Sequence, residues 1–268
     1  MISARVLLFT LSFSMTQVSH PSNERTTGVR PDLELAVVVP VYNEQDSIRN
    51  VLEEWCETLK RLGIRFCVFA YDDGSKDDSS DVLRAVASIY PQNIKVISKQ
   101  NSGHGPTILR GYKEVAPLAE WIFQMDSDNE MSAKSFSQLW ERRTDYDFLL
   151  GCRQGRRQPI VRCLVSLVSR LVIRCFYGSG TGWDVNSPYR LMRSSAFKSL
   201  FQMMPGNTFA PNLIVSGYVA RKGLNYSEIP VPHKERQTGE VSIKKWKLLK
   251  AAVRSFYQTI SFSTRFFL

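Results

Sequence analysis

Two aspartates separated by a single residue are the strongest chemical signal in this sequence. Asp126 and Asp128 follow the apolar run from Trp121 to Met125, which is typical of a buried strand. A strand end can direct both carboxylates into one space, and two hard oxygen ligands with open coordination positions suit Mg²⁺ or Mn²⁺ bridging a diphosphate. The alternative is a turn that caps the next helix, although Ser132 is the better helix cap.

A second acidic turn follows another apolar run. Asp72 and Asp73 precede Gly74 and Ser75, and a carboxylate at this place can accept hydrogen bonds from a nucleoside base or a ribose. The alternative is an ordinary turn with a helix cap, in which Gly74 supplies a positive φ. Neither acidic pair decides its chemistry alone, so the elements that position both pairs have to be considered.

The polar segments stand where strands are predicted to end. Apolar runs rich in β-branched residues predict strands at 35–40, 65–71, 94–98, 121–125 and 147–151. Apolar residues at helical spacing predict helices at 46–62, 78–90, 105–115, 132–143 and 160–177, the second turning Val82, Leu83, Val86 and Ile89 inward. This alternation predicts an α/β fold with a mostly parallel sheet flanked by helices, in which ligands bind beyond the carboxyl ends of the strands. Polar segments fall at those ends, at 40–44, 72–73, 101–105, 126–128 and 153.

Composition and charge narrow the function classes. The 268 residues can bury a sizeable core, and 43% hydrophobic and 22% charged content excludes wholesale disorder. The net charge of +10 is concentrated, because residues 151–193 hold eight arginines and one aspartate and residues 241–268 hold six basic and no acidic residues. These segments predict an anionic partner: nucleic acid, anionic lipid or a phosphorylated substrate. Five scattered cysteines without a CxxC pair disfavour a disulfide framework or a zinc site.

The ends of the chain are predicted to be separate from the α/β domain, which is expected at 33–240. Residues 1–32 are expected to be a disordered leader and linker. Their short apolar run at 6–15 is a weak signal peptide or follows a mis-set start codon, and the second interpretation is favoured. No stretch qualifies as a membrane-spanning helix, since the apolar run at 160–177 contains three arginines.

Four segments match a known family in order and spacing. They are PVYNE at 40–44, DDGSKDDS at 72–79, NSGHG at 101–105 and QMDSD at 124–128. Over roughly residues 34–245 the chain resembles family 2 glycosyltransferases, which have the GT-A fold. It is most similar to the polyprenyl-phosphate glycosyltransferase branch, which includes dolichyl-phosphate mannose synthase.

The resemblance implies a nucleotide-sugar donor and a divalent cation, Mg²⁺ or Mn²⁺, as cofactor. The residues that it places on the nucleoside are Pro40, Tyr42 and Glu44, together with Asp72 or Asp73. The residues that it places on the metal are Asp126 and Asp128, with Glu130 as a further ligand where the family often has glutamine.

The resemblance continues in a segment that covers the donor phosphates. RQTG at 236–239 resembles the start of the family's mobile R-x-x-G-x-S-K segment, and Arg236 is carried over as a donor-binding residue. The family's lysine six residues after this arginine is Ser242 here, so Lys244 or Lys245 would have to replace it.

On the acceptor side the resemblance covers three segments. GCR at 151–153 resembles the family's G-x-R, and DVNSPYR at 184–190 resembles a segment that closes the acceptor end of the pocket. Arg162 and Ser166, four apart on one helix face, resemble the arginine and serine that meet the acceptor phosphate. The residues expected to carry catalysis are Asp128, Arg153, Arg162, Ser166 and Asp184.

The acceptor decides whether a general base is needed. A phosphate monoester has a second pKa of about 6, so it is anionic near neutral pH and supplies its own nucleophile; arginine forks suit such an acceptor. A sugar hydroxyl would need a base, for which Asp184 is the candidate outside the metal motif. A catalytically silent membrane-associated scaffold is the alternative of another class. Nucleic acid is not expected as a partner, because no nucleic-acid motif is present.

Residues 241–268 are predicted to form a basic amphipathic helix that lies on an anionic membrane surface. The apolar stripe of this helix is Trp246, Leu249, Val253, Phe256 and Ile260, and its basic side is Lys244, Lys247, Lys250 and Arg254. The alternative is a core-packing helix with a solvated basic face. The protein is therefore expected in the cytoplasm, peripheral at the cytosolic face of a membrane, with a membrane-protein partner as a further option.

Taken together, the resemblance implies an inverting, metal-dependent glycosyltransferase. Its donor would be a UDP- or GDP-hexose, and its acceptor a polyprenyl phosphate such as undecaprenyl or dolichyl phosphate. The sequence leaves open the sugar, the nucleotide base, the prenyl length and the oligomeric state.

Overall fold

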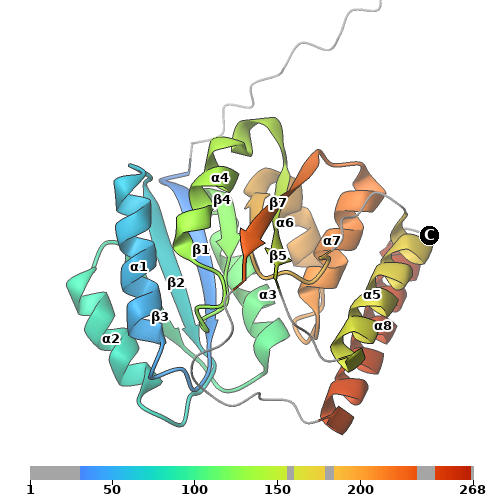
Figure 1. Cartoon of the computed structure of the whole chain (residues 1–268), viewed down its shortest axis with the longest axis horizontal. Helices are drawn as coiled ribbons and strands as arrows, with labels where there is room; N and C mark the ends of the chain where they lie inside the picture. Colours follow the sequence, from blue (N-terminus) through green and yellow to red (C-terminus); the bar gives the residue numbers. More distant parts are fainter. Residues whose placement is uncertain (1–30, 156–159, 179–183, 234–244, 267–268) are drawn as a thin grey trace, which may run out of the picture. The chain divides into compact units, whose positions relative to one another are not determined.

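The computed structural model describes residues 31–155, 160–178, 184–233 and 245–266. Within these residues seven strands form one sheet in the order β3-β2-β1-β4-β6-β5-β7 (Figure 1). The strands are β1 (Leu33–Val41), β2 (Phe66–Asp72), β3 (Ile94–Ser98), β4 (Ala119–Gln124), β5 (Phe148–Gln154), β6 (Arg190–Arg193) and β7 (Tyr226–Pro232). The helices are α1 (Ile48–Arg61), α2 (Ser79–Ile89), α3 (His104–Val115), α4 (Phe136–Glu141), α5 (Ile160–Tyr177), α6 (Ser194–Met203), α7 (Pro211–Lys222) and α8 (Lys245–Phe266).

Parallel strands dominate the sheet. β1 pairs in parallel with β2 and β4, β2 with β3, and β5 with β7. Among the described strands, β6 runs against both of its neighbours, β4 and β5. Arg190 at the start of β6 lies opposite Gln124 at the end of β4, so the residues before β6 reach the same edge as those after β4. The prediction of a mostly parallel sheet flanked by helices is confirmed.

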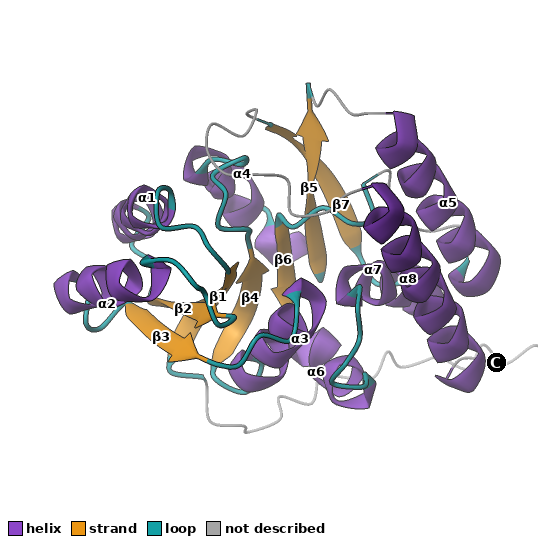
Figure 2. Ribbon diagram, turned by 90° about the horizontal axis from the view of Figure 1, so that it is seen from below, coloured by secondary structure: helices purple, strands orange, loops and turns teal. Residues whose placement is uncertain are grey.

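Helices cover both faces of the sheet because its central strands are apolar on both sides. In β1, Val37 and Val39 face one core while Ala36 and Val38 face the other, and all four are fully buried. The first face is covered by α1, α2 and α4, and the second by α3, α6 and α7 (Figure 2). The continuous apolar run in β1 is the pattern expected of a strand buried on both faces.

Helices α5 and α8 lie side by side and pack with α7 (Figures 1 and 2). Tyr177 of α5 is buried against Leu213 of α7. The Tyr177 hydroxyl donates to the carbonyl oxygen of Thr259 in α8 at 2.8 Å, and Ser263 Oγ donates to the carbonyl oxygen of Phe176 at 2.7 Å. Hydroxyl-to-carbonyl bonds therefore join α5 and α8 in addition to apolar contact.

α8 exposes part of its predicted apolar stripe, since Val253 is 61% exposed. Among the described side chains of α8, the buried ones are Ala252, Ser255, Thr259, Phe262 and Ser263. Four of these five side chains are small or hydroxylated, which allows α8 to approach α5 closely, and the hydroxyl of Ser263 bonds to a carbonyl group of α5.

In α2, Ile89 was expected to face inward but is 58% exposed. The helix packs on the sheet through Leu83 and Val86, and Ile89 is its last residue. In the part of the chain that the structure describes, no helix combines the length and the apolar character needed to cross a bilayer.

Candidate active site

Two loops at the carboxyl edge of the sheet, 42–45 after β1 and 74–79 after β2, are joined by reciprocal hydrogen bonds. The Asn43 N–H donates to Ser75 Oγ at 3.1 Å, and the Lys76 N–H donates to Asn43 Oδ1 at 2.8 Å. Asn43 has a positive φ of 54°, which asparagine tolerates better than most residues. Further bonds link Gln45 with Asp77 and Asp78, and Glu44 with Ser79. The two segments predicted to bind the nucleoside are therefore held in one fixed arrangement.

The three residues of the first loop that were predicted to contact the nucleoside differ in exposure. Pro40 is buried in β1, Tyr42 is 39% exposed and Glu44 is partly exposed. Ser47 Oγ lies 3.1 Å from Glu44 Oε2 and also 3.1 Å from the carbonyl oxygen of Ser127. Tyr42 and Glu44 are the accessible members of this set, and Ser47 links their loop to the acidic motif after β4.

Asp73 anchors a neighbouring loop. It is 4% exposed, pairs with Lys99, and accepts hydrogen bonds from the N–H groups of Ser102 (2.8 Å) and Gly103 (2.9 Å). Burial alone would raise the pKa of Asp73, but Lys99 and these N–H groups outweigh it and hold the pKa below its usual value. Asp72 is equally buried, at 4% exposed, and its Oδ1 accepts a hydrogen bond from the N–H of Ser75 at 2.9 Å. Both carboxylates therefore shape the turn, and the choice between them for the nucleoside stays a prediction.

Asp126 lies where β4 meets the N-terminus of α3. Its Oδ1 is 3.2 Å from His104 Nε2 and accepts a hydrogen bond from Gln124 Nε2, also at 3.2 Å. Burial disfavours the carboxylate, yet His104, Arg153 and Gln124 together lower the pKa of Asp126. Desolvation disfavours the imidazolium in the same way, but Asp126 and Asp128 raise the pKa of His104. Asp126 is therefore an anion at neutral pH, and His104 and Arg153 are the neighbours that most favour its charge.

Glu130 is not brought into one metal cluster with the two aspartates. Its backbone N–H donates to Asp128 Oδ1 at 3.2 Å, and its Oε2 lies 2.8 Å from His233 Nε2. Within the described residues, no three His, Cys, Asp or Glu side chains converge as a metal site. The Glu130 carboxylate pairs instead with the imidazole of His233 in this structure, and its place among the metal ligands stays a prediction.

The two aspartates themselves fit a divalent cation by the chemistry of their oxygen atoms. Mg²⁺ is usually held by one or two carboxylates, with substrate phosphates and water completing its coordination. Asp126 is 30% exposed, so a ligand can reach it, and both aspartates act on the same imidazole, that of His104. The donor set suits a cation that arrives with a diphosphate better than one enclosed by protein ligands alone.

Arg153 and Asp184 form a two-pronged ion pair at the end of β5. Arg153 Nε lies 2.7 Å from Asp184 Oδ2, and Arg153 Nη2 lies 2.6 Å from Oδ1. Burial works against the guanidinium charge, but Asp184, and then Asp126 and Glu130, raise the pKa of Arg153. The structure therefore brings Arg153, from the predicted acceptor side, within electrostatic range of Asp126, from the predicted metal motif.

The segment 184–190 is fixed to β5 by its serine and tyrosine. Ser187 Oγ donates to the carbonyl oxygen of Gly151 at 2.6 Å. The Tyr189 ring covers Gly151 so closely that a Cβ on this glycine would lie 2.7 Å from the ring. These contacts place Asp184, at the start of the segment, beside Arg153.

Arg190 at the end of this segment is a structural residue. It is fully buried, and its guanidinium donates to the carbonyl oxygens of Val185, Ser187 and Asn212 at 2.6–3.3 Å. Burial lowers the pKa of Arg190 to about 10, which leaves it charged at neutral pH. It organises the loop from inside and does not face a ligand.

Three predicted residues are not linked to this centre by described contacts. Arg162 and Ser166 belong to α5, and Ser166 is partly exposed. The side chain of Arg162 and the whole of Arg236 lie outside the described residues. Their roles stay predictions that rest on the family resemblance.

Three other side chains join the site without having been selected from the sequence: His104 and Gln124 beside Asp126, and His233 beside Glu130. The sequence does contain a signal for Gln124. It is an amide inside an apolar run, and a buried amide needs hydrogen-bond partners. The two histidines carry a weaker signal, because each stands in a polar loop where histidine is ordinary.

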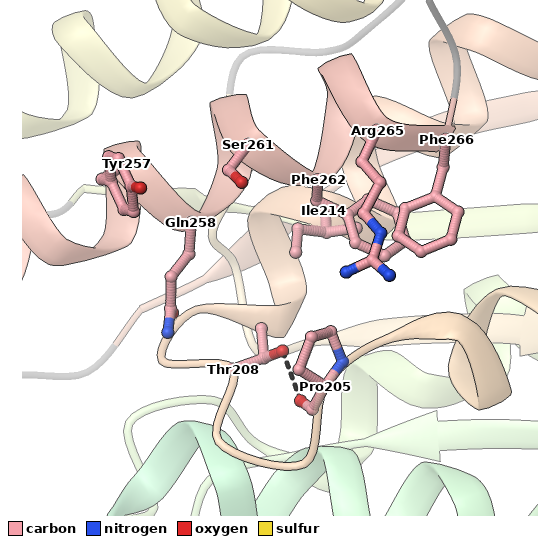
Figure 3. Close-up of a pocket in the computed structure, with 9 residues that line it drawn as sticks. All are labelled: Pro205, Thr208, Ile214, Tyr257, Gln258, Ser261, Phe262, Arg265 and Phe266. Carbon is pink, nitrogen blue, oxygen red and sulfur yellow. Dashed lines mark hydrogen bonds between the residues drawn. The ribbon is translucent and has the colours of Figure 1, made fainter.

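A separate small pocket lies between α8 and the loop before α7 (Figure 3). It has a volume of about 100 Å³, and Thr208, Gln258 and Arg265 are among the residues that line it. Thr208 Oγ1 donates to the carbonyl oxygen of Pro205 at 2.6 Å and so tightens the loop at one wall. None of the predicted site residues lines this pocket, so it is distinct from the carboxylate site.

A match to a known family model identifies the family of this chain. Residues 36–201, more than half of the chain, match the model described as glycosyl transferase family 2. The chain belongs to glycosyl transferase family 2.

Two curated proteins that are similar to this family member are both named undecaprenyl-phosphate 4-deoxy-4-formamido-L-arabinose transferase. The protein from Sodalis glossinidius (strain morsitans) is 29% identical over 227 residues, which cover 84% of this chain and 66% of that protein. The protein from Klebsiella pneumoniae (strain 342) is 29% identical over 212 residues, covering 78% and 62%. The chain spans just under two thirds of the length of these relatives. The resemblance to the polyprenyl-phosphate branch of the family is confirmed.

Solved structures confirm the GT-A fold. Glucosyl-3-phosphoglycerate synthase from Mycobacterium tuberculosis, in complex with Mn²⁺, UDP-glucose and phosphoglyceric acid, has a TM-score of 0.61 at 15% identity, covering 87% of this chain and 80% of that one. A mannosyltransferase from Pyrobaculum calidifontis, in complex with GDP-Man and Mn²⁺, has a TM-score of 0.61 at 14% identity, covering 88% and 65%. At these identities the likeness concerns the fold of the family.

Proposed function

We propose that this protein is a metal-dependent glycosyltransferase that moves a sugar, with inversion, from a nucleoside-diphosphate sugar to a polyprenyl phosphate. The observation that carries the proposal is that Asp126, after β4, and the Arg153–Asp184 pair, after β5, act on each other at one edge of the sheet. A cation-binding carboxylate beside an anion-binding arginine suits a reaction between a diphosphate and a phosphate. The names of the curated relatives support this acceptor class.

On the donor side, Asp126 and Asp128 would hold Mg²⁺ or Mn²⁺, which as a Lewis acid neutralises charge on the departing diphosphate. Tyr42 and Glu44, with Asp72 or Asp73, would contact the nucleoside of a UDP- or GDP-sugar. The solved complexes of the same fold contain Mn²⁺ with UDP-glucose or GDP-Man, which supports this class of donor.

On the acceptor side, Arg153 would bind the acceptor phosphate, and Asp184 orients Arg153 through both of its oxygens. An oxygen of this phosphate attacks the anomeric carbon as the bond from that carbon to the donor diphosphate breaks on the opposite side. The configuration therefore inverts, and the electron pair leaves with the diphosphate. No protein base is needed because the acceptor is already anionic. Arg162 and Ser166 would add contacts to the acceptor, and Arg236 to the donor phosphates.

A saccharide hydroxyl is the alternative acceptor within the same fold, with Asp184 as general base. The ion pair disfavours this role, since both Asp184 oxygens accept hydrogen bonds from Arg153. Comparison of Asp184→Asn with Arg162→Ala separates the two. A base role requires the larger loss of turnover in Asp184→Asn and a pH dependence that this variant removes, whereas a phosphate acceptor requires the larger loss in Arg162→Ala.

The lipid acceptor would be reached from the cytosolic face of a membrane on which α5 and α8 lie. Both helices expose apolar side chains, at Leu167, Val168 and Leu171 in α5 and at Val253 and Tyr257 in α8. Lys250 and Arg254 are exposed on α8 as well. Exposed apolar residues beside basic ones suit an anionic membrane interface.

Vesicle flotation tests this membrane surface. With vesicles of phosphatidylglycerol and phosphatidylcholine, we expect the double variant Val253→Ser, Tyr257→Ser to bind about tenfold or more weakly, since each buried apolar side chain contributes roughly 1.5–3 kcal/mol. Ile89→Ser is the matched control, because Ile89 is equally exposed but lies on α2. Equal binding of both variants would contradict an interfacial role for α8.

The activity itself is tested with purified protein, Mn²⁺, polyprenyl phosphate and radiolabelled nucleotide sugars, followed by organic extraction. The panel includes UDP- and GDP-hexoses and a nucleotide-linked 4-deoxy-4-formamido-L-arabinose. We expect label in the lipid phase with at least one donor. Asp128→Ala should reduce transfer by about 100-fold or more, because the cation contributes several kcal/mol.

Asp81→Ala is the control for this substitution, since Asp81 is 74% exposed on α2, and it should retain full activity. Full activity of Asp128→Ala would refute the metal assignment. No transfer and no metal-dependent hydrolysis with any donor would instead favour a silent membrane-associated scaffold.

A further inference from the structure

Four polar side chains from four different elements are buried together behind Asp126. They are Tyr112 of α3, Gln124 of β4, Arg190 of β6 and Asn212 of α7, and none is more than 5% exposed. Buried polar groups reduce stability unless they are hydrogen-bonded. A cluster of this kind beside a functional carboxylate therefore calls for an account of every bond.

The bonds of Gln124 determine which way its amide faces. Its Oε1 accepts a hydrogen bond from Asn212 Nδ2 (2.8 Å), and its Nε2 donates to Asp126 Oδ1 (3.2 Å). The Tyr112 hydroxyl lies 2.9 Å from both Gln124 Oε1 and Asn212 Oδ1 and shares its one proton between these two oxygens. A flipped amide would set two NH₂ groups against each other at Asn212 and a carbonyl oxygen against the Asp126 carboxylate. Only the observed orientation satisfies both neighbours, so the amide N–H of Gln124 is directed at Asp126.

Asn212 is held at both its side chain and its backbone. The Tyr112 hydroxyl lies 2.9 Å from Asn212 Oδ1, on the side-chain amide. Arg190 Nη1 donates to the main-chain carbonyl oxygen of Asn212 at 3.1 Å, and Arg190 Nη2 donates to the main-chain carbonyl oxygens of Val185 and Ser187 at 3.3 and 2.6 Å. The segment that these bonds hold begins at Asp184, the partner of Arg153. One buried cluster therefore reaches the carboxylate of the metal motif on one side and the acceptor segment on the other.

We propose, on the basis of the function inferred above, that Gln124 is a positioning residue for Asp126. Its amide sets the rotation of the Asp126 carboxylate, and Asn212 keeps that amide from turning over. The cluster thereby holds the carboxylate ready for a cation before any ligand binds. Groups that orient metal-binding side chains in this way change metal affinity or activity by about 10–100-fold when they are removed.

The test compares Mn²⁺ binding by the full chain and its variants, measured from the electron paramagnetic resonance of free Mn²⁺ in the presence of UDP or GDP. Gln124→Met keeps an unbranched side chain but removes the donor to Asp126, and we expect about 10–100-fold weaker binding. Asn212→Ala leaves Gln124 in place but removes the group that fixes its amide, and we expect a smaller loss in the same direction. The Mn²⁺ concentration for half-maximal transfer should rise in parallel, with the KM for the acceptor unchanged.

Tyr71→Phe is the control for the loss of a side-chain hydrogen bond at α3 that lies outside the cluster. The Tyr71 hydroxyl donates to Glu114 Oε2 at 3.0 Å and makes no bond to the cluster, so this variant should bind Mn²⁺ as the native chain does. Thermal unfolding establishes whether each variant is folded. If Gln124→Met does not fold, the result for Asn212→Ala decides the test.

Native Mn²⁺ affinity in both folded variants, even with a lowered melting temperature, would overturn the proposal and leave the cluster a purely structural role. A native chain that binds no Mn²⁺ would overturn it together with the metal assignment. Normal Mn²⁺ binding that weakens in the variants, without any labelled lipid, would support the positioning role and contradict the proposed transfer reaction.

Discussion

Single side chains at this edge of the sheet keep their charge because a partner outweighs the effect of burial. Asp73, Asp126 and Arg153 are each disfavoured as ions by burial, and each has its pKa shifted towards the charged form by neighbours of opposite charge. Arg190 meets carbonyl dipoles at its described hydrogen bonds, and its pKa falls to about 10. An oppositely charged partner therefore distinguishes Asp73, Asp126 and Arg153 from Arg190, whose described partners are neutral carbonyl groups.

The buried Asp73–Lys99 pair predicts an acid-dependent loss of stability. The folded-state pKa of Asp73 lies below its ordinary value of 3.8, so the pair contributes fully above pH 3.8 and its contribution is lost as the pH falls through the folded-state pKa. We expect Asp73→Asn to lower the free energy of unfolding at pH 7 by about 3 kcal/mol, because Lys99 is left buried and unpaired.

Near pH 3 the native chain has itself lost part of this contribution, so the difference between native protein and variant should be smaller. Urea unfolding at the two pH values measures both differences, with Asp81→Asn as an exposed control. An equal difference at pH 7 and pH 3 would show that the ion pair is not the source of the effect.

At the scale of elements, the N-terminus of α3 packs closely against the loop before α7, and this approach requires a residue without a side chain at position 105. A Cβ on Gly105 would lie 1.8 Å from the carbonyl oxygen of Phe209, so no other residue fits without movement of the backbone. The next residue towards the N-terminus is His104, which contacts Asp126. The packing of one glycine thus controls where α3 meets the metal motif.

Gly105→Ala should therefore affect both stability and activity. We expect a loss of about 1–3 kcal/mol in the free energy of unfolding, as is usual for overpacking, and a reduced rate of transfer because His104 is displaced. Gly206→Ala serves as the control, since this glycine lies in the adjoining loop and a Cβ there meets nothing within 4 Å. Similar stability of the two variants in urea unfolding would argue against a rigid contact at Gly105.

The first five strands could be predicted from the sequence to within three residues, because their apolar runs are local signals. β6, α6, α7 and β7 lacked such signals. β6 has only four residues with arginine at each end, and Arg190 is buried by contacts from distant segments. α7 is buried on most sides, including Asn212 and Ser216, so it has no polar face from which a helical period can be detected.

In the candidate site, likewise, the local motifs could be predicted from the sequence and the contacts between distant residues could not. The acidic motifs are contiguous in the sequence and follow recognisable strands. The contact of Glu130 with His233 joins residues 103 positions apart, and that of Gln124 with Asn212 joins residues 88 apart. Only folding brings such pairs together, which is why neither the contact of Glu130 with His233 nor the role of Gln124 beside Asp126 could be predicted from the sequence.

At the scale of the whole molecule, ligands that bind the carboxyl edge should stabilise the entire fold. Mn²⁺ with the matching nucleoside diphosphate at 100 times its Kd should add about 2.7 kcal/mol, which corresponds to roughly 5–10 °C in Tm for a chain of this size. The larger shift of UDP or GDP identifies the donor base. Addition of EDTA should remove the shift, and Asp128→Ala should show none; a shift that persists with EDTA would mean that the nucleotide binds without a cation.

Because β6 runs antiparallel to its neighbours, the segment proposed to bind the acceptor and the loops proposed to bind the donor lie in different parts of the sequence. The loops after the parallel strands β1, β2 and β4 supply the residues proposed for the nucleotide. The segment 184–190, which comes before β6, belongs to the proposed acceptor side. Insertions or replacements in that segment can remodel what the protein accepts without disturbing the loops that recognise the donor. A chain of this topology can therefore diverge towards new acceptors one segment at a time while it keeps its donor.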